Sequence, residues 1–146
     1  MRTITVQRTI KAPIERVFEQ ISDHARYKEF GGLKDSFLVR EGRTEKNGVG
    51  ALREIDAGLA WFQEEITVFE RPTRMDYLIV KSRPPIEHQG GSVRLRAIPE
   101  GTEVTWTSTM RIKIPLIGGL LTALAVPQLG KGFGGMLKAI ERKLAA

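Results

Sequence analysis

Three charged side chains on three separate predicted strands are the strongest candidates for chemistry in this sequence. They are Arg53, Glu64 and Lys81. If each tight turn between neighbouring strands has two residues, the register places Glu64 opposite Lys81 and brings Arg53 close to them, on the face that carries the apolar residues. Charges that face an apolar interior are costly unless they are paired. We therefore expect these residues to have a function.

The chemistry open to them is orientation of a ligand or proton transfer. Arg53 and Lys81 could orient a carboxylate or phenolate or polarise a carbonyl, and Glu64, the one candidate catalytic residue, could act as a general base. Two structural alternatives remain. The residues could form an ion pair at the sheet edge, or a one-residue bulge could turn them outward.

The same registers predict an apolar wall around these charges. Tyr77 and Trp106 face inward, where each could pack on a ligand and also form a hydrogen bond with it; ordinary core aromatics are the alternative. The predicted ligand-binding residues are Arg53, Phe62, Glu64, Ile66, Tyr77, Ile79, Lys81, Leu95, Trp106, Ser108, Met110, Phe133 and Leu137.

Other kinds of site are disfavoured. The chain has no cysteine, and its two histidines, His24 and His88, lack the spacing of metal ligands, so no metal and no cofactor is predicted. His88 could lie at a cavity mouth, although a plain loop histidine is the simpler interpretation. Residues 130–135 match GxGxxG, but a dinucleotide site needs that motif after a strand, and here it lies inside a helical pattern.

Composition indicates one domain, residues 1–146, of ordinary hydrophobicity. No signal peptide or membrane-spanning run is apparent, and we expect a cytoplasmic protein. The net charge of +6 permits acidic partners, including anionic membranes. Nucleic acid is disfavoured as a partner, because aromatic residues make up only 7% of the chain and most of them are predicted to be buried.

The element that must position the site is the C-terminal segment, residues 114–146. Its apolar residues fall on one stripe of an α-helix. They are Leu129, Phe133, Met136, Leu137, Ile140 and Leu144. Pro127 and several glycines predict a kink or break near residue 127.

The apolar stripe needs a sheet to cover it, and the rest of the chain supplies one. A strand at 3–11 precedes two short helices, the first with Ile14, Val17, Phe18 and Ile21 and the second with Tyr27 and Phe30. Further strands are predicted at 35–41, 51–56, 59–70, 75–81, 92–98 and 102–114, with a long loop at 82–91. The fold class is therefore α+β, with a curved antiparallel sheet of six to seven strands wrapped around a long C-terminal helix.

The charge-free run at residues 114–126 has three possible roles. Its large apolar residues are Leu116, Ile117, Leu120, Leu121 and Leu124. The preferred interpretation is a lid over the cavity. A homodimer surface, or peripheral contact with a membrane helped by Arg111 and Lys113, comes second.

This order of elements resembles the START-like, Bet v 1-like helix-grip superfamily (SRPBCC), which includes polyketide cyclase/dehydratase-type proteins. The residues that carry the resemblance are Ala12-Pro13-xx-Arg16-Val17-Phe18, Ser22-Asp23, Tyr27-xx-Phe30, Gly48-x-Gly50-xx-Arg53, Glu65-Ile66-xx-Phe69-x-Arg71-Pro72, Gly101-Thr102-x-Val104-x-Trp106 and Leu137-Lys138-xx-Glu141. Phe30 stands where family members usually carry Trp. The resemblance implies an apolar cavity between sheet and helix, without implying one function.

Three functions remain open. The first is binding of a small hydrophobic molecule, such as a lipid, a fatty acyl or an aromatic polyketide-like compound. The second is a cyclase or dehydratase that uses Glu64 as acid and base. The third is a non-catalytic interaction module acting through the basic outer face, where Arg94 and Arg96 are predicted to project.

Overall fold

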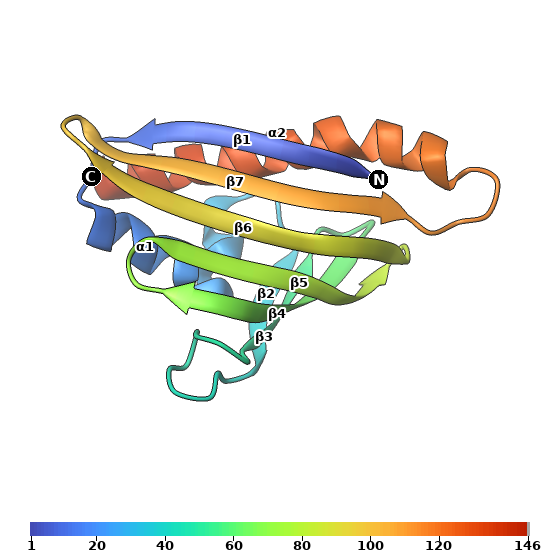
Figure 1. Ribbon diagram of the computed structural model, residues 1–146, viewed down its shortest axis with the longest axis horizontal. Helices are drawn as coiled ribbons and strands as arrows, with labels where there is room; N and C mark the ends of the chain where they lie inside the picture. The colour runs from blue at the N-terminus through green and yellow to red at the C-terminus, as the bar shows by residue number, and fades with distance from the viewer. Residues whose placement is uncertain (146) are drawn as a thin grey trace.

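The computed structural model describes residues 1–145 (Figure 1). Its elements are β1 (Arg2–Ile10), α1 (Ile14–Ser22), the 3-10 helix η1 (His24–Phe30), β2 (Asp35–Arg40), β3 (Leu52–Asp56), β4 (Trp61–Glu70), β5 (Arg74–Arg83), β6 (Ile86–Ile98), β7 (Gly101–Ile112) and α2 (Gly118–Ala145). The predicted order of elements is therefore confirmed.

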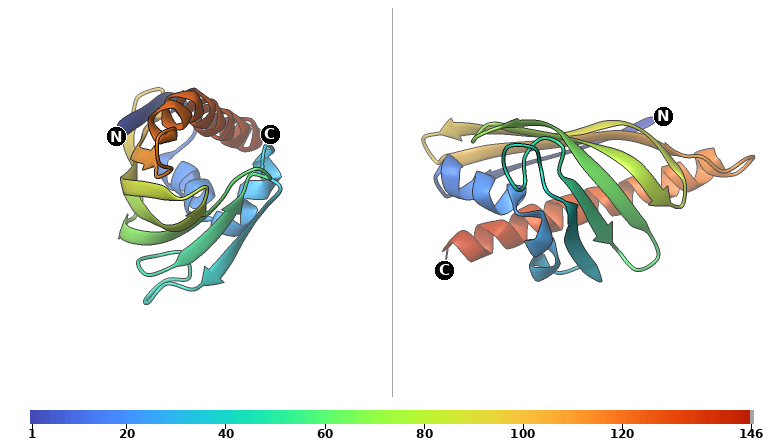
Figure 2. Two further views of the ribbon diagram at one scale, coloured as in Figure 1. Left: turned by 90° about the vertical axis from the view of Figure 1, so that its right-hand side faces the viewer. Right: turned by 90° about the horizontal axis from the view of Figure 1, so that it is seen from below.

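The seven strands form one antiparallel sheet in the order β1-β7-β6-β5-β4-β3-β2. The sheet curls, and α2 lies across its concave side (Figure 2). The two short helices, α1 and η1, follow β1 and lie at one end of the concave side. This arrangement confirms the α+β helix-grip fold, with seven strands around the long C-terminal helix.

Apolar periodicity explains how the helices pack. In α1, Val17, Phe18 and Ile21 are buried, as expected for residues at i, i+1 and i+4 of an amphipathic helix. In α2, Leu137 and Ile140 are fully buried within the main core. The other members of the predicted stripe, which are Leu129, Phe133, Met136 and Leu144, are partly buried against the core clusters.

The predicted loop at 82–91 is wrong. β5 continues to Arg83 and β6 begins at Ile86, so Pro84 and Pro85 alone connect the two strands. Gly91 lies within β6, where it pairs with Tyr77. A Cβ atom on Gly91 would lie 2.1 Å from Cζ of Tyr77. The glycine signal therefore marks a close approach of a ring to the backbone rather than a loop.

The predicted break near residue 127 is also wrong, because α2 is assigned as one helix with Pro127 inside it. Figure 2 shows it crossing the sheet without interruption. Proline removes one backbone donor from a helix. The side chain of Pro127 is exposed, whereas the following residues, Leu129, Phe133 and Leu137, pack on the sheet. Tertiary packing outweighs the local propensity here.

Candidate functional site

A cavity of about 760 Å³ lies between the concave face of the sheet and α2. Most of the predicted ligand-binding residues line it, namely Arg53, Phe62, Glu64, Tyr77, Ile79, Trp106, Ser108, Met110 and Phe133. The rings of Trp106 and Phe133 stack across the sheet–helix boundary, with centroids 4.1 Å apart and planes 3° from parallel. The helix and the sheet thus contribute one continuous aromatic wall.

Three predicted residues are buried in the packed core instead. Ile66 and Leu137 have no exposed surface, Leu95 is 5% exposed, and all three belong to the main hydrophobic cluster. They do not line the cavity, although they lie on the inner face as expected. Facing the interior does not decide whether a residue meets a ligand or another side chain.

The prediction that Lys81 faces the interior beside Glu64 is wrong. Glu64 pairs with Ile79, and Lys81 pairs with Gln63, because the register shifts between Gln63 and Glu64. Lys81 is exposed, and its Nζ lies 5.9 Å from the centroid of the Trp61 ring. The irregularity turns the lysine outward, which was the structural alternative left open by the sequence.

Arg53 and Glu64 do lie together. The predicted two-residue turn after β3 is wrong, because Asp56 pairs with Trp61 and four residues intervene. Arg53 therefore faces Glu64 rather than Phe62. Nε of Arg53 donates to Oε1 of Glu64 at 2.7 Å, and the two side chains are only 1% and 11% exposed.

The buried guanidinium also ties the sheet to the short helices. Nη1 of Arg53 lies 2.8 Å from Nδ1 of His24 and donates to the Tyr27 hydroxyl at 3.0 Å. The Tyr27 hydroxyl in turn donates to the backbone carbonyl of Ile21. The guanidinium carbon lies 5.1 Å from the Tyr27 ring centroid and 4.9 Å from that of Tyr77. Such contacts compensate for the desolvation of a buried charge.

His24 belongs to this network, and sequence reasoning missed it. The residue is fully buried, and its Nε2 lies 3.2 Å from the backbone carbonyl oxygen of Asn47. Burial and the charge of Arg53 hold the pKa of His24 well below its ordinary value. The neutral ring therefore accepts from Arg53 through Nδ1 and donates to Asn47 through Nε2. No spacing pattern in the sequence connects residue 24 with residue 53.

A second polar cluster forms the neighbouring wall. His88 Nδ1 accepts from the backbone N–H of Ile79 at 2.9 Å, so its Nε2 carries the hydrogen and donates to Ser108 Oγ at 2.9 Å. Trp106 Nε1 donates to the Tyr77 hydroxyl at 2.9 Å. Burial lowers the pKa of His88 to about 4, and burial, reinforced by Glu64, raises the pKa of Tyr77. Both groups are therefore neutral near pH 7.

Counting donors and acceptors leaves two groups available to a ligand. The hydroxyls of Tyr77 and Ser108 each accept one bond, from Trp106 and His88. At most one of their two hydrogens can lie between them, so one remains to donate into the cavity. On Glu64, Arg53 bonds only to Oε1, which leaves Oε2 as an acceptor. The polar end of the cavity thus offers one neutral donor and one carboxylate oxygen.

The prediction that residues 114–126 form a lid over the cavity is wrong. Leu116, Leu120 and Leu124 are 106%, 63% and 62% exposed, and none of them lines the cavity between sheet and helix. The buried stripe of α2 already faces the sheet, and the helical period places Leu120 and Leu124 on the opposite side, whereas Leu116 precedes the helix. Leu121 is the exception, because it packs against the cluster of Ile4, Met110 and Ile112.

Metal-ligand clusters and membrane-spanning helices are two further features that geometry can reveal. Among residues 1–145, no three His, Asp or Glu side chains gather in a way that would hold a metal ion. Within the same residues, no helix has the length and apolar character needed to cross a bilayer.

Comparison with known proteins agrees with this fold. Residues 1–145 match the family model described as polyketide cyclase/dehydrase and lipid transport. The chain belongs to this family, and its fold is the START-like, Bet v 1-like helix-grip fold. The description of the family supports a role in binding hydrophobic ligands. Among curated proteins, none matches the sequence.

Solved structures show the same fold at low sequence identity. A protein from Thermus thermophilus is 21% identical, with a TM-score of 0.80 over 99% of this chain and 97% of that one. A START superfamily protein from Mycobacterium smegmatis is 12% identical, with a TM-score of 0.75 over 98% and 97%. Ara h 8.0201 is 18% identical, with a TM-score of 0.66 over 99% and 97%.

Proposed function

We propose that this protein binds a small hydrophobic molecule in the cavity between the sheet and α2. The observation that carries the proposal is a cavity of about 760 Å³ with predominantly apolar walls and a few polar groups. Ligand sites in proteins have this volume and this division between apolar walls and a few polar groups. A lipid, a fatty acyl compound or an aromatic polyketide-like compound would fit this chemistry.

The polar groups favour a ligand with an oxygen-bearing end. A carbonyl or ether oxygen would accept the spare hydrogen of the Tyr77–Ser108 pair, and a hydroxyl would donate to Oε2 of Glu64. A ligand with a free carboxylate is disfavoured at this point, since it would face the Glu64 carboxylate. Glu64 already occupies the position next to Arg53 as its ion-pair partner, so a ligand carboxylate could not take that position.

The first test is native mass spectrometry of freshly purified protein, followed by extraction and identification of the bound molecule. We expect one small, mostly apolar molecule per chain. The fluorescent probe 1-anilinonaphthalene-8-sulfonate then gives a binding assay for stripped protein. If neither a natural ligand nor the apolar probe binds, the proposal fails.

Two neighbouring residues of β5 provide a matched pair of variants. Ile79 lines the cavity, whereas Val80 is 50% exposed on the other face of the strand. Ile79→Trp should fill the cavity and abolish probe binding, and Val80→Trp should leave it unchanged. Equal binding by the two variants would contradict a site in this cavity.

A second candidate function is catalysis in the same cavity, as a cyclase or dehydratase. The observation that favours it is the free Oε2 of Glu64 next to a hydroxyl donor, because a base and an electrophilic donor are what enolisation or dehydration requires. Glu64→Gln keeps an oxygen that can accept from Arg53 but removes the base. A carrier should retain ligand binding in this variant, whereas an enzyme should bind and lose turnover.

A further inference from the structure

Large apolar side chains project into solvent where α2 begins. Leu116 is 106% exposed, Ile117 50%, Leu120 63% and Leu124 62%. We call these four residues the apolar tip. Isolated exposed leucines are common on soluble proteins, but a contiguous group within nine residues of chain marks a surface that meets another apolar phase.

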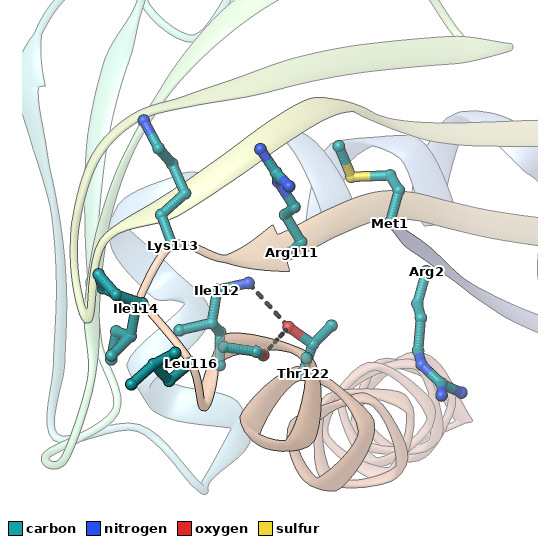
Figure 3. Close-up of a pocket in the computed structure, with 11 residues that line it drawn as sticks. Met1, Arg2, Arg111, Ile112, Lys113, Ile114, Leu116 and Thr122 are labelled. Carbon is teal, nitrogen blue, oxygen red and sulfur yellow. Dashed lines mark hydrogen bonds between the residues drawn. The ribbon is translucent and has the colours of Figure 1, made fainter.

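The apolar tip is held firmly to the sheet. The Thr122 hydroxyl accepts from the backbone N–H of Ile112 and donates to the carbonyl of Gly118, at 2.8 and 2.7 Å (Figure 3). A Cβ atom on Gly118 would lie 2.4 Å from the Ile112 carbonyl oxygen, so only glycine permits this approach. Leu116 has a φ of 70°, a conformation that leucine rarely adopts. The leucines are thus presented by a fixed scaffold.

Positive charge lies on one side of the apolar tip, next to Leu116. Arg2, Arg111 and Lys113 line an open pocket of about 890 Å³ together with Leu116 (Figure 3). Arg111 pairs with Glu87 at 2.6 Å. Among residues 1–145, no acidic side chain lies within ion-pair distance of Arg2 or Lys113. These two cations remain available to an external anionic group.

The rest of α2 also carries an excess of positive charge. Its charged residues are Lys131, Lys138, Glu141, Arg142 and Lys143, so bases outnumber acids. The one acid, Glu141, is already bonded to Arg8 at 2.8 Å. An apolar group bordered by basic residues is the pattern of surfaces that rest on anionic bilayers.

The face of α2 that carries Leu120 and Leu124 also borders the cavity. Leu120, Leu124, Gln128 and Lys131 are spaced by four, four and three residues, which places them along one face of the helix. Gln128 and Lys131 are exposed and line the cavity at its rim. A surface that receives the apolar tip would therefore lie next to the cavity mouth.

We propose that the apolar tip, together with the neighbouring basic residues Arg2 and Lys113, forms a docking surface for an anionic lipid bilayer. The leucines would enter the interfacial region while Arg2 and Lys113 meet the headgroups. A second copy of this chain fits less well. In a two-fold interface the same patch meets itself, which would bring the cations of the two copies close together. The proposal does not rest on the cavity ligand.

The test is co-sedimentation of the full chain with vesicles of phosphatidylcholine alone, or of equal parts phosphatidylcholine and phosphatidylglycerol. We expect binding to the anionic vesicles only. Leu120→Ser with Leu124→Ser should weaken it by about tenfold or more, and Lys113→Glu by about fivefold. Val80→Ser, which removes an apolar side chain that is 50% exposed on β5, should leave it unchanged.

Thermal unfolding confirms that each variant is folded, and sedimentation velocity reports the oligomeric state. Failure of the unmodified chain to bind anionic vesicles overturns the proposal, as does undiminished binding of the double leucine variant. A dimer that the double leucine variant converts to monomers would make this surface a self-interface and also overturn it. Probe binding in the cavity is measured separately, so this proposal and the proposed function fail independently.

Discussion

At the scale of single residues, Arg53 and Glu64 have different roles despite sharing an ion pair. Arg53 donates to Glu64, His24 and Tyr27 and lies against two tyrosine rings, so its contacts are already largely taken up. Glu64 keeps one carboxylate oxygen on the cavity. Arg53 is therefore a positioning residue, and Glu64 is the member of the pair that can meet a ligand.

This division predicts asymmetric effects on stability. Arg53→Met should lower the free energy of unfolding by about 3–5 kcal/mol, because it leaves Glu64 buried without its partner. Arg53→Met combined with Glu64→Leu should recover at least about 1 kcal/mol of that loss. Urea unfolding measures the free energy of unfolding of both variants and of Glu64→Leu alone, which completes a double-mutant cycle. Strict additivity of the two single changes would show that the pair is not coupled.

His88 predicts a dependence of stability on pH. Its pKa is about 4 in the folded chain and about 6.5 when unfolded. Between these values the unfolded chain binds more protons, so stability is full well above pH 6.5 and falls as the pH approaches 4. Because solvent partly screens this half-buried ring, the loss between pH 7 and pH 5 should be about 1 kcal/mol from this residue.

The variant His88→Gln isolates that contribution, since an amide can accept from Ile79 and donate to Ser108 without titrating. The difference in unfolding free energy between pH 7 and pH 5 should be smaller in the variant by the amount given above. Carboxylates that titrate over the same range affect both proteins equally. An unchanged pH dependence would mean that His88 does not remain neutral in the folded chain.

At the scale of elements, α2 keeps glycines that its packing does not require. A Cβ atom on Gly132 would have no neighbour within 4 Å. Gly132→Ala should therefore raise the free energy of unfolding by roughly 0.5–1 kcal/mol. Gly91→Ala is the contrasting case. Its Cβ atom would overlap the Tyr77 ring, so stability and probe binding should both fall. Thermal unfolding measures the stability of both variants, and a stabilised Gly91→Ala would contradict the described approach of Tyr77.

Sequence periodicity predicted which face of each element is buried better than it predicted strand registers. Val104, Trp106, Ser108 and Met110 alternate inward as expected. A two-residue turn at residues 100–101 would place Leu95 opposite Trp106. The actual partner of Trp106 is Val93, and this shift of two residues keeps the inner face. Around Glu64 the register shifts by one, which moves Lys81 to the outside. Irregularities in a strand depend on the whole sheet, so a turn-based register does not reveal them.

The candidate site was predictable only in part, for a related reason. Arg53 and Glu64 stand out as charges on the predicted apolar face of their strands, whereas His24 follows a helix end and carries no such contrast. Its burial arises from a contact with a strand that lies 29 residues further along the chain. The ligand-binding role of all these residues stays a prediction until a ligand is found.

At the scale of the whole molecule, the core consists of two packed clusters, and residues of both line the cavity. One cluster joins α1 and the main core, and the other joins Ile4, Met110 and Ile112 to the first half of α2. A ligand in the cavity would bridge sheet and helix. Binding to the folded state alone stabilises a protein by mass action.

Stripped protein should therefore gain about 2.7 kcal/mol of unfolding free energy when 1-anilinonaphthalene-8-sulfonate is present at a hundredfold excess over its Kd. Thermal unfolding at increasing probe concentration measures the gain, and Ile79→Trp should show none. An equal gain in Ile79→Trp would place the probe elsewhere on the molecule.

The order of strands has a consequence for how the chain is made. β1 pairs with β7 along its whole length, from Arg2 opposite Met110 to Ile10 opposite Thr102. The first strand of the sheet to be synthesised therefore gains its partner only when the last strand, β7, has been made. Pairing across such a separation is slow to form, and an unpaired strand can join another chain in the meantime. During synthesis, Arg2 and Arg8 give this waiting strand a positive charge that discourages premature association.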